Sequence, residues 1–185
     1  MLQFIVPMLI MTGARKREVL DAKWSDFDVQ KRSWRIPISK SGKARHVPLS
    51  EGVIQLLTQV GVVQQTWAPA LHDCVWPFAN PSTGKPFVSI FCAWNTARTK
   101  AGLPEVRIHD LRHSFASFLI NNGRSLYEVQ KILGHTQVKT TQRYSHLAQE
   151  TLLNAVNAAV DALGTAFAPI PGLNAGEESA ILLAA

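Results

Sequence analysis

The stretch HDLRHSFAS at residues 109–117 carries more chemical information than any other part of this 185-residue chain. Its pattern predicts a helix over 109–121, and His109 and His113 are four residues apart, so they lie on one helix face. Such a pair can bind a metal ion. However, the sequence provides no acidic third ligand nearby, and Arg112 beside the pair would repel a cation. We therefore expect no metal site, and His113 is interpreted as a packed, hydrogen-bonded histidine.

Three further stretches combine basic residues with glycine, histidine or tyrosine. They are TGARKREVLDAKW at 12–24, SKSGKARHVPLS at 39–50 and LGHTQVKTTQRYSHL at 133–147. Taken alone, the basic run at 15–17 is more typical of a solvated helix face, and a lone tyrosine is more typical of an ordinary surface residue. What gives these stretches weight is their combination and their order along the chain.

The hydrophobic pattern between these stretches predicts an α+β fold, mainly α-helical with a small antiparallel β-sheet near the N-terminus. Alternating apolar residues predict short strands within residues 27–49, joined by a turn at 40–43. Glycine and proline make residues 61–88 loop-rich. The predicted helices, beside the one at 109–121, span residues 4–11, 14–24, 50–60, 89–101, 125–133 and 150–163, with a further turn or helix at 136–144.

Composition limits the classes of function. The net charge is +6, which favours an acidic partner such as nucleic acid, and 46% hydrophobic residues exclude a disordered chain. The two cysteines, Cys74 and Cys92, are too few for a disulfide framework, so a reducing cytoplasm is expected. The apolar run at 1–11 is too short to span a bilayer, which takes about 20 residues. No membrane association is predicted.

In order and wording, the four stretches together resemble the tyrosine recombinase, or phage integrase, family over residues 1–163. This resemblance implies the family's DNA breaking-and-rejoining catalytic fold. It also implies strand cleavage and rejoining through a covalent 3′-phosphotyrosyl intermediate, without a metal, a nucleotide or any other cofactor. The implied partner is double-stranded DNA, so the protein is expected with the nucleoid.

The resemblance assigns the phosphate-binding roles to four residues. Arg15 and Arg112 match the family's two arginines, and two guanidiniums suit an anionic phosphodiester because each can donate paired, charge-assisted hydrogen bonds. His135 matches a position that hydrogen-bonds the phosphate. Glu18 matches an acidic position that supports the active site structurally.

The resemblance also assigns the groups that move protons. Tyr144 matches the nucleophile, whose phenol has an ordinary pKa of about 10 and therefore needs a base. His109 is the candidate base. Lys40, in the predicted hairpin turn, matches the general acid that protonates the leaving 5′-oxygen, and Lys43 is its near competitor.

Basic residues that flank these positions are the expected contacts to the DNA backbone, and they confer affinity rather than sequence choice. They are Lys16, Arg17, Lys43, Arg45, Lys139 and Arg143.

At the level of domains, we expect a catalytic domain over 1–163 that is N-terminally incomplete, because the family's DNA-clamping N-terminal domain has no counterpart here. Residues 164–185 form an acidic, apolar tail. Either the helix at 150–163 and the tail link subunits into a tetramer on DNA, or the helix packs within its own subunit and residues 165–185 are disordered. Two alternatives to recombination remain open: a truncated DNA-binding or assembly fragment, and a topoisomerase-like enzyme that relaxes DNA with the same chemistry.

Overall fold

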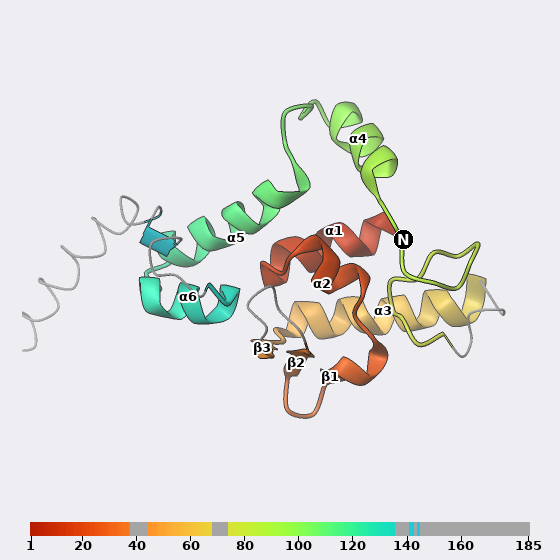
Figure 1. The fold of residues 1–185 in the computed structure, drawn as a ribbon, viewed down its shortest axis with the longest axis horizontal. Coiled ribbons are helices and arrows are strands. Elements are labelled where there is room, and N and C mark those ends of the chain that lie inside the picture. The colour runs from red at the N-terminus through yellow and green to blue at the C-terminus, as the bar shows by residue number, and fades with distance from the viewer. Residues whose placement is uncertain (38–43, 68–73, 136–140, 143, 145–185) are drawn as a thin grey trace, which may run out of the picture. The chain divides into compact units, whose positions relative to one another are not determined.

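The computed structural model describes residues 1–37, 44–67, 74–135, 141, 142 and 144, all of which fall within one unit, Met1–Ala148. Helices dominate this part of the chain, and a small three-stranded antiparallel sheet lies near the N-terminus (Figure 1). The predicted fold class is therefore confirmed. The predicted helix at 150–163, the tail at 164–185 and most of the predicted turn at 136–144 lie outside the described residues.

Helix α1 (Leu2–Thr12) forms the centre of the main core. Phe4, Ile5, Met8 and Leu9 are buried, because residues three and four positions apart share one side of a helix. The helix ends at Gly13, which has a left-handed φ of 60°. A Cβ at this position would lie 2.3 Å from Phe115 Cδ1, so both the backbone conformation and the close packing require glycine.

The sheet has the order β1 (Phe27–Asp28), β2 (Ser33–Ile36) and β3 (Arg45–Pro48), and all neighbours are antiparallel. Trp34 in the central strand pairs with Phe27 on one side and Val47 on the other. Alternation along β2 buries Trp34 and Ile36, while Arg35 between them stays exposed. One face of the sheet therefore joins the core that contains α1.

Helix α3 (Glu51–Trp67) is longer than predicted, and the expected end near Val60 is wrong. Gly61 does not stop the helix, since one glycine inside a helix costs only about 1 kcal/mol. Gln64 in the extension is buried, accepts a hydrogen bond from Trp24 Nε1 and donates to the carbonyl oxygens of Trp76 and Pro77. These distant partners stabilise the additional turns.

Helix α2 (Lys16–Leu20) is shorter than the predicted helix at 14–24. A separate 3₁₀ turn, η1, covers Trp24–Asp26. The backbone N–H of Trp24 donates to the carbonyl of Val75 at 2.9 Å, so it is used between segments and not within a helix. The chain therefore turns toward the 75–90 loop after α2.

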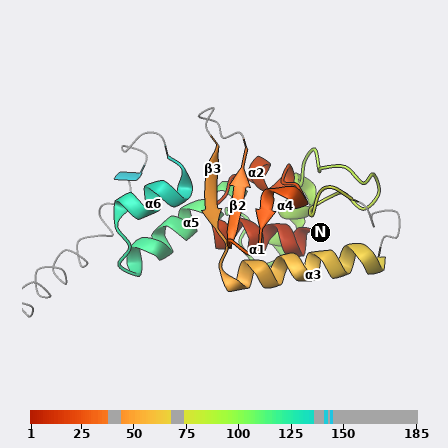
Figure 2. The same cartoon turned by 90° about the horizontal axis from the view of Figure 1, so that it is seen from below.

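Helices α4 (Phe91–Lys100), α5 (Ile108–Asn121) and α6 (Leu126–Leu133) follow their predicted ranges within two residues. Ser125 caps α6 by accepting a hydrogen bond from the N–H of Glu128, and Gly134 ends the helix in a left-handed conformation. Helix α5 packs against α1 and α6, and α6 also contacts β3 (Figure 2). A second apolar cluster, formed by Ala116, Ile120, Val129, Leu133 and Tyr144, lies between α5 and α6.

Candidate active site

Arg15 is positioned by the tight connection between α1 and α2. Thr12 Oγ1 donates to the carbonyl of Met8 at 2.6 Å and accepts from the N–H of Ala14 at 3.3 Å, which fixes the turn around Gly13. Arg15 is then the N-cap residue of α2, and its backbone N–H donates to Glu18 Oε2 at 2.7 Å. Hydrogen bonds within residues 8–18 thus fix the backbone position from which the Arg15 side chain projects.

Glu18 accepts hydrogen bonds from two guanidiniums. Arg15 Nη1 lies 2.8 Å from Glu18 Oε1, while Arg45 Nη1 and Nη2 lie 2.9 and 3.0 Å from Oε1 and Oε2. The side chain of Glu18 is only 7% exposed and that of Arg45 only 10%. Burial lowers the pKa of Arg45 and the charge of Arg15 adds to this, while the Glu18 carboxylate opposes both effects. The carboxylate joins α2 to β3.

Arg45 also packs tightly against the residue that ends α6. A Cβ on Gly134 would lie 2.4 Å from Arg45 Cδ, and the φ of Gly134 is +66°. The absence of a side chain at Gly134 lets the arginine pass directly beside the backbone. The contact of Arg45 with the DNA backbone stays a prediction; in the structure its head group is paired with Glu18 and its side chain is only 10% exposed.

Arg112 is almost fully buried in α5, with 4% of the residue exposed. Its Nη1 donates to the carbonyl of Gly13 at 2.5 Å and its Nη2 donates to that of Leu133 at 2.7 Å. Burial, followed by the charges of Arg15 and Arg45, lowers the pKa of Arg112 to about 10, so it remains a cation at neutral pH. The Arg112 side chain therefore connects two segments: the turn at Gly13, just before Arg15, and the end of α6 at Leu133, just before His135.

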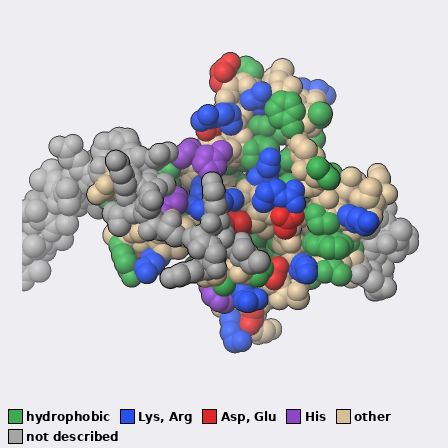
Figure 3. Space-filling model, in the orientation of Figure 1, with side chains coloured by type: hydrophobic (Ala, Val, Ile, Leu, Met, Phe, Trp, Pro, Cys, Tyr) green, Lys and Arg blue, Asp and Glu red, His purple; other side chains and the backbone are tan. Residues whose placement is uncertain are grey.

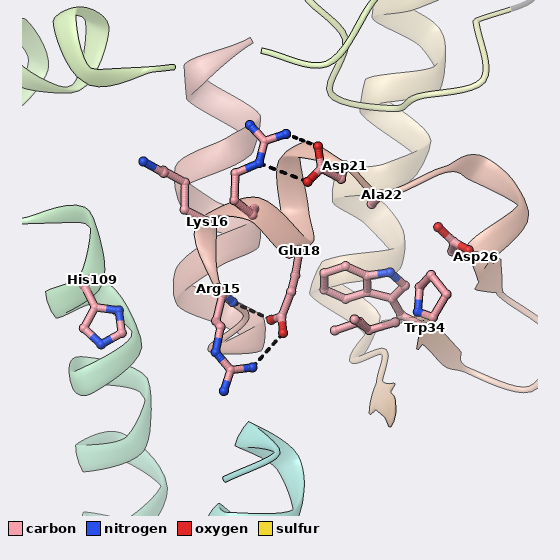
Figure 4. A pocket seen from close by; sticks show the side chains of 11 residues that line it. Arg15, Lys16, Glu18, Asp21, Ala22, Asp26, Trp34 and His109 are labelled. Atoms are coloured by element: carbon pink, nitrogen blue, oxygen red, sulfur yellow. Dashed lines mark hydrogen bonds and ion pairs between the residues drawn. The ribbon is translucent and has the colours of Figure 1, made fainter. Parts of the chain in front are cut away.

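An open pocket of about 660 Å³ lies between α2, β2 and the start of α5. Arg15 and Lys16 line one side, and His109 on α5 faces them across the opening (Figure 4). Burial lowers the pKa of His109, and the nearby charges of His113 and Arg112 lower it further. Lys16, His109 and Arg112 also line a smaller adjoining cavity of about 200 Å³.

Tyr144 belongs to the apolar cluster between α5 and α6. Its phenol oxygen forms a hydrogen bond with Nδ1 of His113. His113 in turn makes an edge-to-face contact with His109, with ring centroids 4.8 Å apart. His135 Nδ1 lies 2.9 Å from Thr141 Oγ1. The sequence predicted a hydrogen-bonded His113, but not that its partner is the tyrosine.

The structure places some of the predicted residues together and leaves others apart. Arg15 pairs with Glu18, Arg112 lies near enough for the charges of both to affect its pKa, and His109 faces Arg15 (Figure 4). Arg17 pairs with Asp21 and donates to the carbonyl of Phe87, so it faces a neighbouring loop. Four predicted residues lie outside the described residues: Lys40, Lys43, Lys139 and Arg143.

The charge of the site is strongly unbalanced. Arg15 and Arg45 pair with the carboxylate of Glu18, and Arg112 lies near enough for its pKa to be affected by all three charges, so these four residues carry an excess of two positive charges. Lysine, arginine and histidine side chains lie close together near the middle of the face shown in Figure 3. Within the described part of the chain, no group of three or more His, Cys, Asp or Glu residues is placed to hold a metal ion. The site is suited to an anion.

A model of the phage integrase family matches residues 2–151 of the chain. The chain belongs to the phage integrase family. Tyrosine recombinase XerC of Pediococcus pentosaceus is 33% identical over 156 residues, which cover 80% of this chain and 50% of that protein. The integrase of Salmonella phage P22 is 28% identical, with 82% and 40% covered. This integrase-family chain thus spans about half the length, or less, of these curated relatives.

Solved structures of integrase-family proteins have the same fold. The catalytic domain of bacteriophage HP1 integrase matches with a TM-score of 0.61 and 27% identity, covering 91% of this chain and 85% of that domain. The site-specific recombinase XerH, in a post-cleavage complex with its difH substrate, matches with a TM-score of 0.66 and 27% identity, covering 84% and 44%. None of the helices among the described residues is long and apolar enough to cross a membrane.

Proposed function

We propose that this chain is the DNA-cleaving part of a site-specific recombinase, which breaks and rejoins strands through a 3′-phosphotyrosyl intermediate. The observation that carries the proposal is the group of Arg15, Arg45 and Arg112 near Glu18, in which Arg15 lines the pocket that His109 also lines. Arg112 links this cluster to the end of α6, and Tyr144 packs against that same helix.

The excess positive charge of this cluster fits a phosphodiester. Attack on phosphorus increases the negative charge on the non-bridging oxygens, and prearranged donors stabilise that charge in the transition state. Removing one such donor typically costs about 3–4 kcal/mol of the activation barrier. Arg15 and Arg112 would bind the oxygens, while Arg45 stays with Glu18.

In the proposed step, Tyr144 Oη forms a bond to the scissile phosphorus and the bond from phosphorus to the 5′-oxygen breaks. The phenol loses its proton to a base, and the departing 5′-oxygen gains one from an acid. The family resemblance assigns the acid to Lys40 and a phosphate contact to His135. A 5′-hydroxyl reverses the same step and releases the tyrosine, so no external energy source is consumed.

Double-stranded DNA is the proposed partner, and such a partner would place the protein with the nucleoid. The related XerH was crystallised with its DNA substrate after cleavage, which supports this choice. Assembly into a tetramer through residues 150–185 stays a prediction, because that segment lies outside the described residues.

The test is to capture a covalent adduct. The 185-residue chain is incubated with a library of nicked duplexes in which randomised sequence surrounds the nick, so that the short strand bearing the 5′-hydroxyl diffuses away after cleavage. We expect an adduct that survives detergent, is removed by protease and is absent with Tyr144→Phe. Sequencing the captured DNA then identifies a preferred site.

Other outcomes point to other functions. Salt-sensitive DNA binding without any adduct would contradict the enzymatic proposal and favour a DNA-binding or assembly module, an alternative raised by the partial coverage of the relatives. Adduct formation together with plasmid relaxation, but without strand exchange between two captured sites, would favour a topoisomerase-like activity.

A further inference from the structure

The two histidines of α5 have different surroundings, although they are one helical turn apart. His109 lines the pocket together with Arg15 and Lys16. His113 instead directs Nδ1 to the phenol oxygen of Tyr144, with ring centroids 6.0 Å apart. A general base must lie within hydrogen-bond reach of the proton that it removes. Within the described structure, His113 meets this requirement for Tyr144.

We propose that His113 accepts the phenol proton of Tyr144 during strand cleavage, and that His109 serves the phosphate side of the site. The inference rests on the proposed function and deepens it, since the family resemblance gives the role of base to His109. The proton moves from Oη to Nδ1 of a neutral His113 that carries its hydrogen on Nε2. Oη then bonds to phosphorus, and in the return step His113 gives the proton back.

The burial of Tyr144 explains why a side chain must act as the base. The tyrosine is only 6% exposed and packs with Ala116, Ile120 and Leu133. Bulk water therefore has little access to the hydroxyl, and an ordinary phenol with a pKa of about 10 stays protonated at neutral pH. The same packing fixes the ring, so that the hydroxyl keeps its place beside His113.

The neighbours of His113 suit a temporary imidazolium. His109 has a lowered pKa because of burial and the nearby charges, so it is neutral at pH 7 and adds no second positive charge. Asp110 contributes a negative charge on the same helix. Its pKa is lowered mainly by hydrogen bonds from Arg107, and the charge of His113 also lowers it. The guanidinium of Arg112 donates to Gly13 and Leu133 and is thereby held by other partners.

The composition of the chain allows a sharp test. It contains two tyrosines, Tyr127 and Tyr144, and Tyr127 is 65% exposed. In a Tyr127→Phe background, growth on fluorinated tyrosine labels Tyr144 alone and lowers the pKa of its phenol. Single-turnover adduct formation is then measured with the nicked duplex selected from the library. The variants are His113→Ala, His113→Gln and, as the matched control one turn away, His109→Ala.

We expect both His113 variants to slow adduct formation by about 100-fold or more, the usual scale of general-base catalysis. Fluorinated Tyr144 should restore at least tenfold of this loss, because a more acidic phenol depends less on a base. It should not restore the loss in His109→Ala. External imidazole should partly rescue His113→Ala, in which a cavity replaces the ring.

Three results would overturn the inference while leaving the proposed function intact: His113 variants that cleave at the rate of the parent protein, a loss that fluorinated Tyr144 leaves unchanged, or a rescue seen instead in His109→Ala. If His113→Ala fails to fold by circular dichroism, His113→Gln decides the outcome. Absence of any adduct with the parent protein would contradict the proposed function and this inference together.

Discussion

Glu18 accepts hydrogen bonds from two arginines that come from distant parts of the chain, one at the start of α2 and one on β3. In the proposed function, the carboxylate keeps the guanidinium of Arg15 in one place before a phosphate binds. Arg45 needs the same carboxylate because its own head group is buried. A single side chain therefore sets both the position and the charge balance of the site.

Removing the charge of Glu18 tests this arrangement. Glu18→Gln leaves the buried guanidinium of Arg45 without its carboxylate and beside the partly exposed guanidinium of Arg15. We expect the free energy of unfolding to fall by about 3 kcal/mol, the usual cost of removing one partner of a buried ion pair. Urea denaturation measures the change. The control is Arg32→Met, which breaks the exposed pair with Glu51 and should cost less than about 1 kcal/mol. Equal effects would contradict the prediction.

His109 gives the protein a predictable pH dependence. Its pKa in the folded protein lies below the ordinary value of 6.5, so the unfolded state binds the proton more readily. Stability from this residue is therefore fully present above pH 6.5, and it is lost as the pH falls from there through the lowered pKa of the folded protein. We expect His109→Gln to reduce the loss of unfolding free energy between pH 7.5 and 5.5, measured by urea titration. If His109→Gln lost as much unfolding free energy over this pH range as the parent protein, His109 would not be the source of the pH dependence.

At the scale of elements, the end of α6 is fitted to β3 by the contact between Gly134 and Arg45. The C-terminal cap of this helix thus has a role beyond ending it, because the same residue decides how closely the strand and its arginine can approach. Leu133, one residue earlier, accepts the hydrogen bond from Arg112. Three segments therefore meet at this cap.

Comparing Gly134→Ala with Gly123→Ala separates the cost of backbone strain from the cost of the collision with Arg45. Both glycines have positive φ values, +66° and +76°, so each substitution costs about 1 kcal/mol in backbone strain. A Cβ at Gly123 meets nothing within 4 Å, whereas at Gly134 it collides with Arg45. We expect Gly134→Ala to lose a further 1–3 kcal/mol or so of unfolding free energy. It should also slow adduct formation, and identical results for both variants would argue against the packing role.

For the whole molecule, the net charge is +6, and the basic residues that contribute to it have different surroundings. Part of it lies in the group of Arg15, Arg45 and Arg112, next to the carboxylate of Glu18. Other basic side chains among the described residues are exposed, and Lys16, which lines the pocket, is an example. Exposed basic residues give DNA affinity by releasing counterions, which makes the affinity dependent on salt.

We therefore expect the association constant for an arbitrary duplex to fall steeply between 50 and 200 mM salt, the range over which counterion release acts strongly. Fluorescence anisotropy measures it. Lys16→Ala should reduce the slope of log affinity against log salt by about one. Lys31→Ala, which removes an 82% exposed lysine paired with Asp28, should leave the slope unchanged. Affinity that is independent of salt would contradict the proposed backbone contacts.

Local patterns determined most of the fold, and the resemblance to the family determined the candidate residues. Ser125 and Gly134 mark the ends of α6 because caps act within a few residues along the chain. The alternation around Trp34 likewise predicts β2. The motifs that contain Arg15, His109, Arg112 and Tyr144 are continuous in sequence, so the sequence alone is enough to infer the family.

Only the tertiary structure decided what the side chains contact. Arg45 follows a basic turn and resembles a DNA contact in sequence, yet the fold buries it against Glu18, 27 residues away. Helix α3 extends past Gly61 because Gln64 finds partners in another loop. His113 meets Tyr144 across 31 residues. Helix and strand patterns depend on neighbours within about four residues, whereas these contacts depend on how whole elements pack, and a single sequence does not specify that.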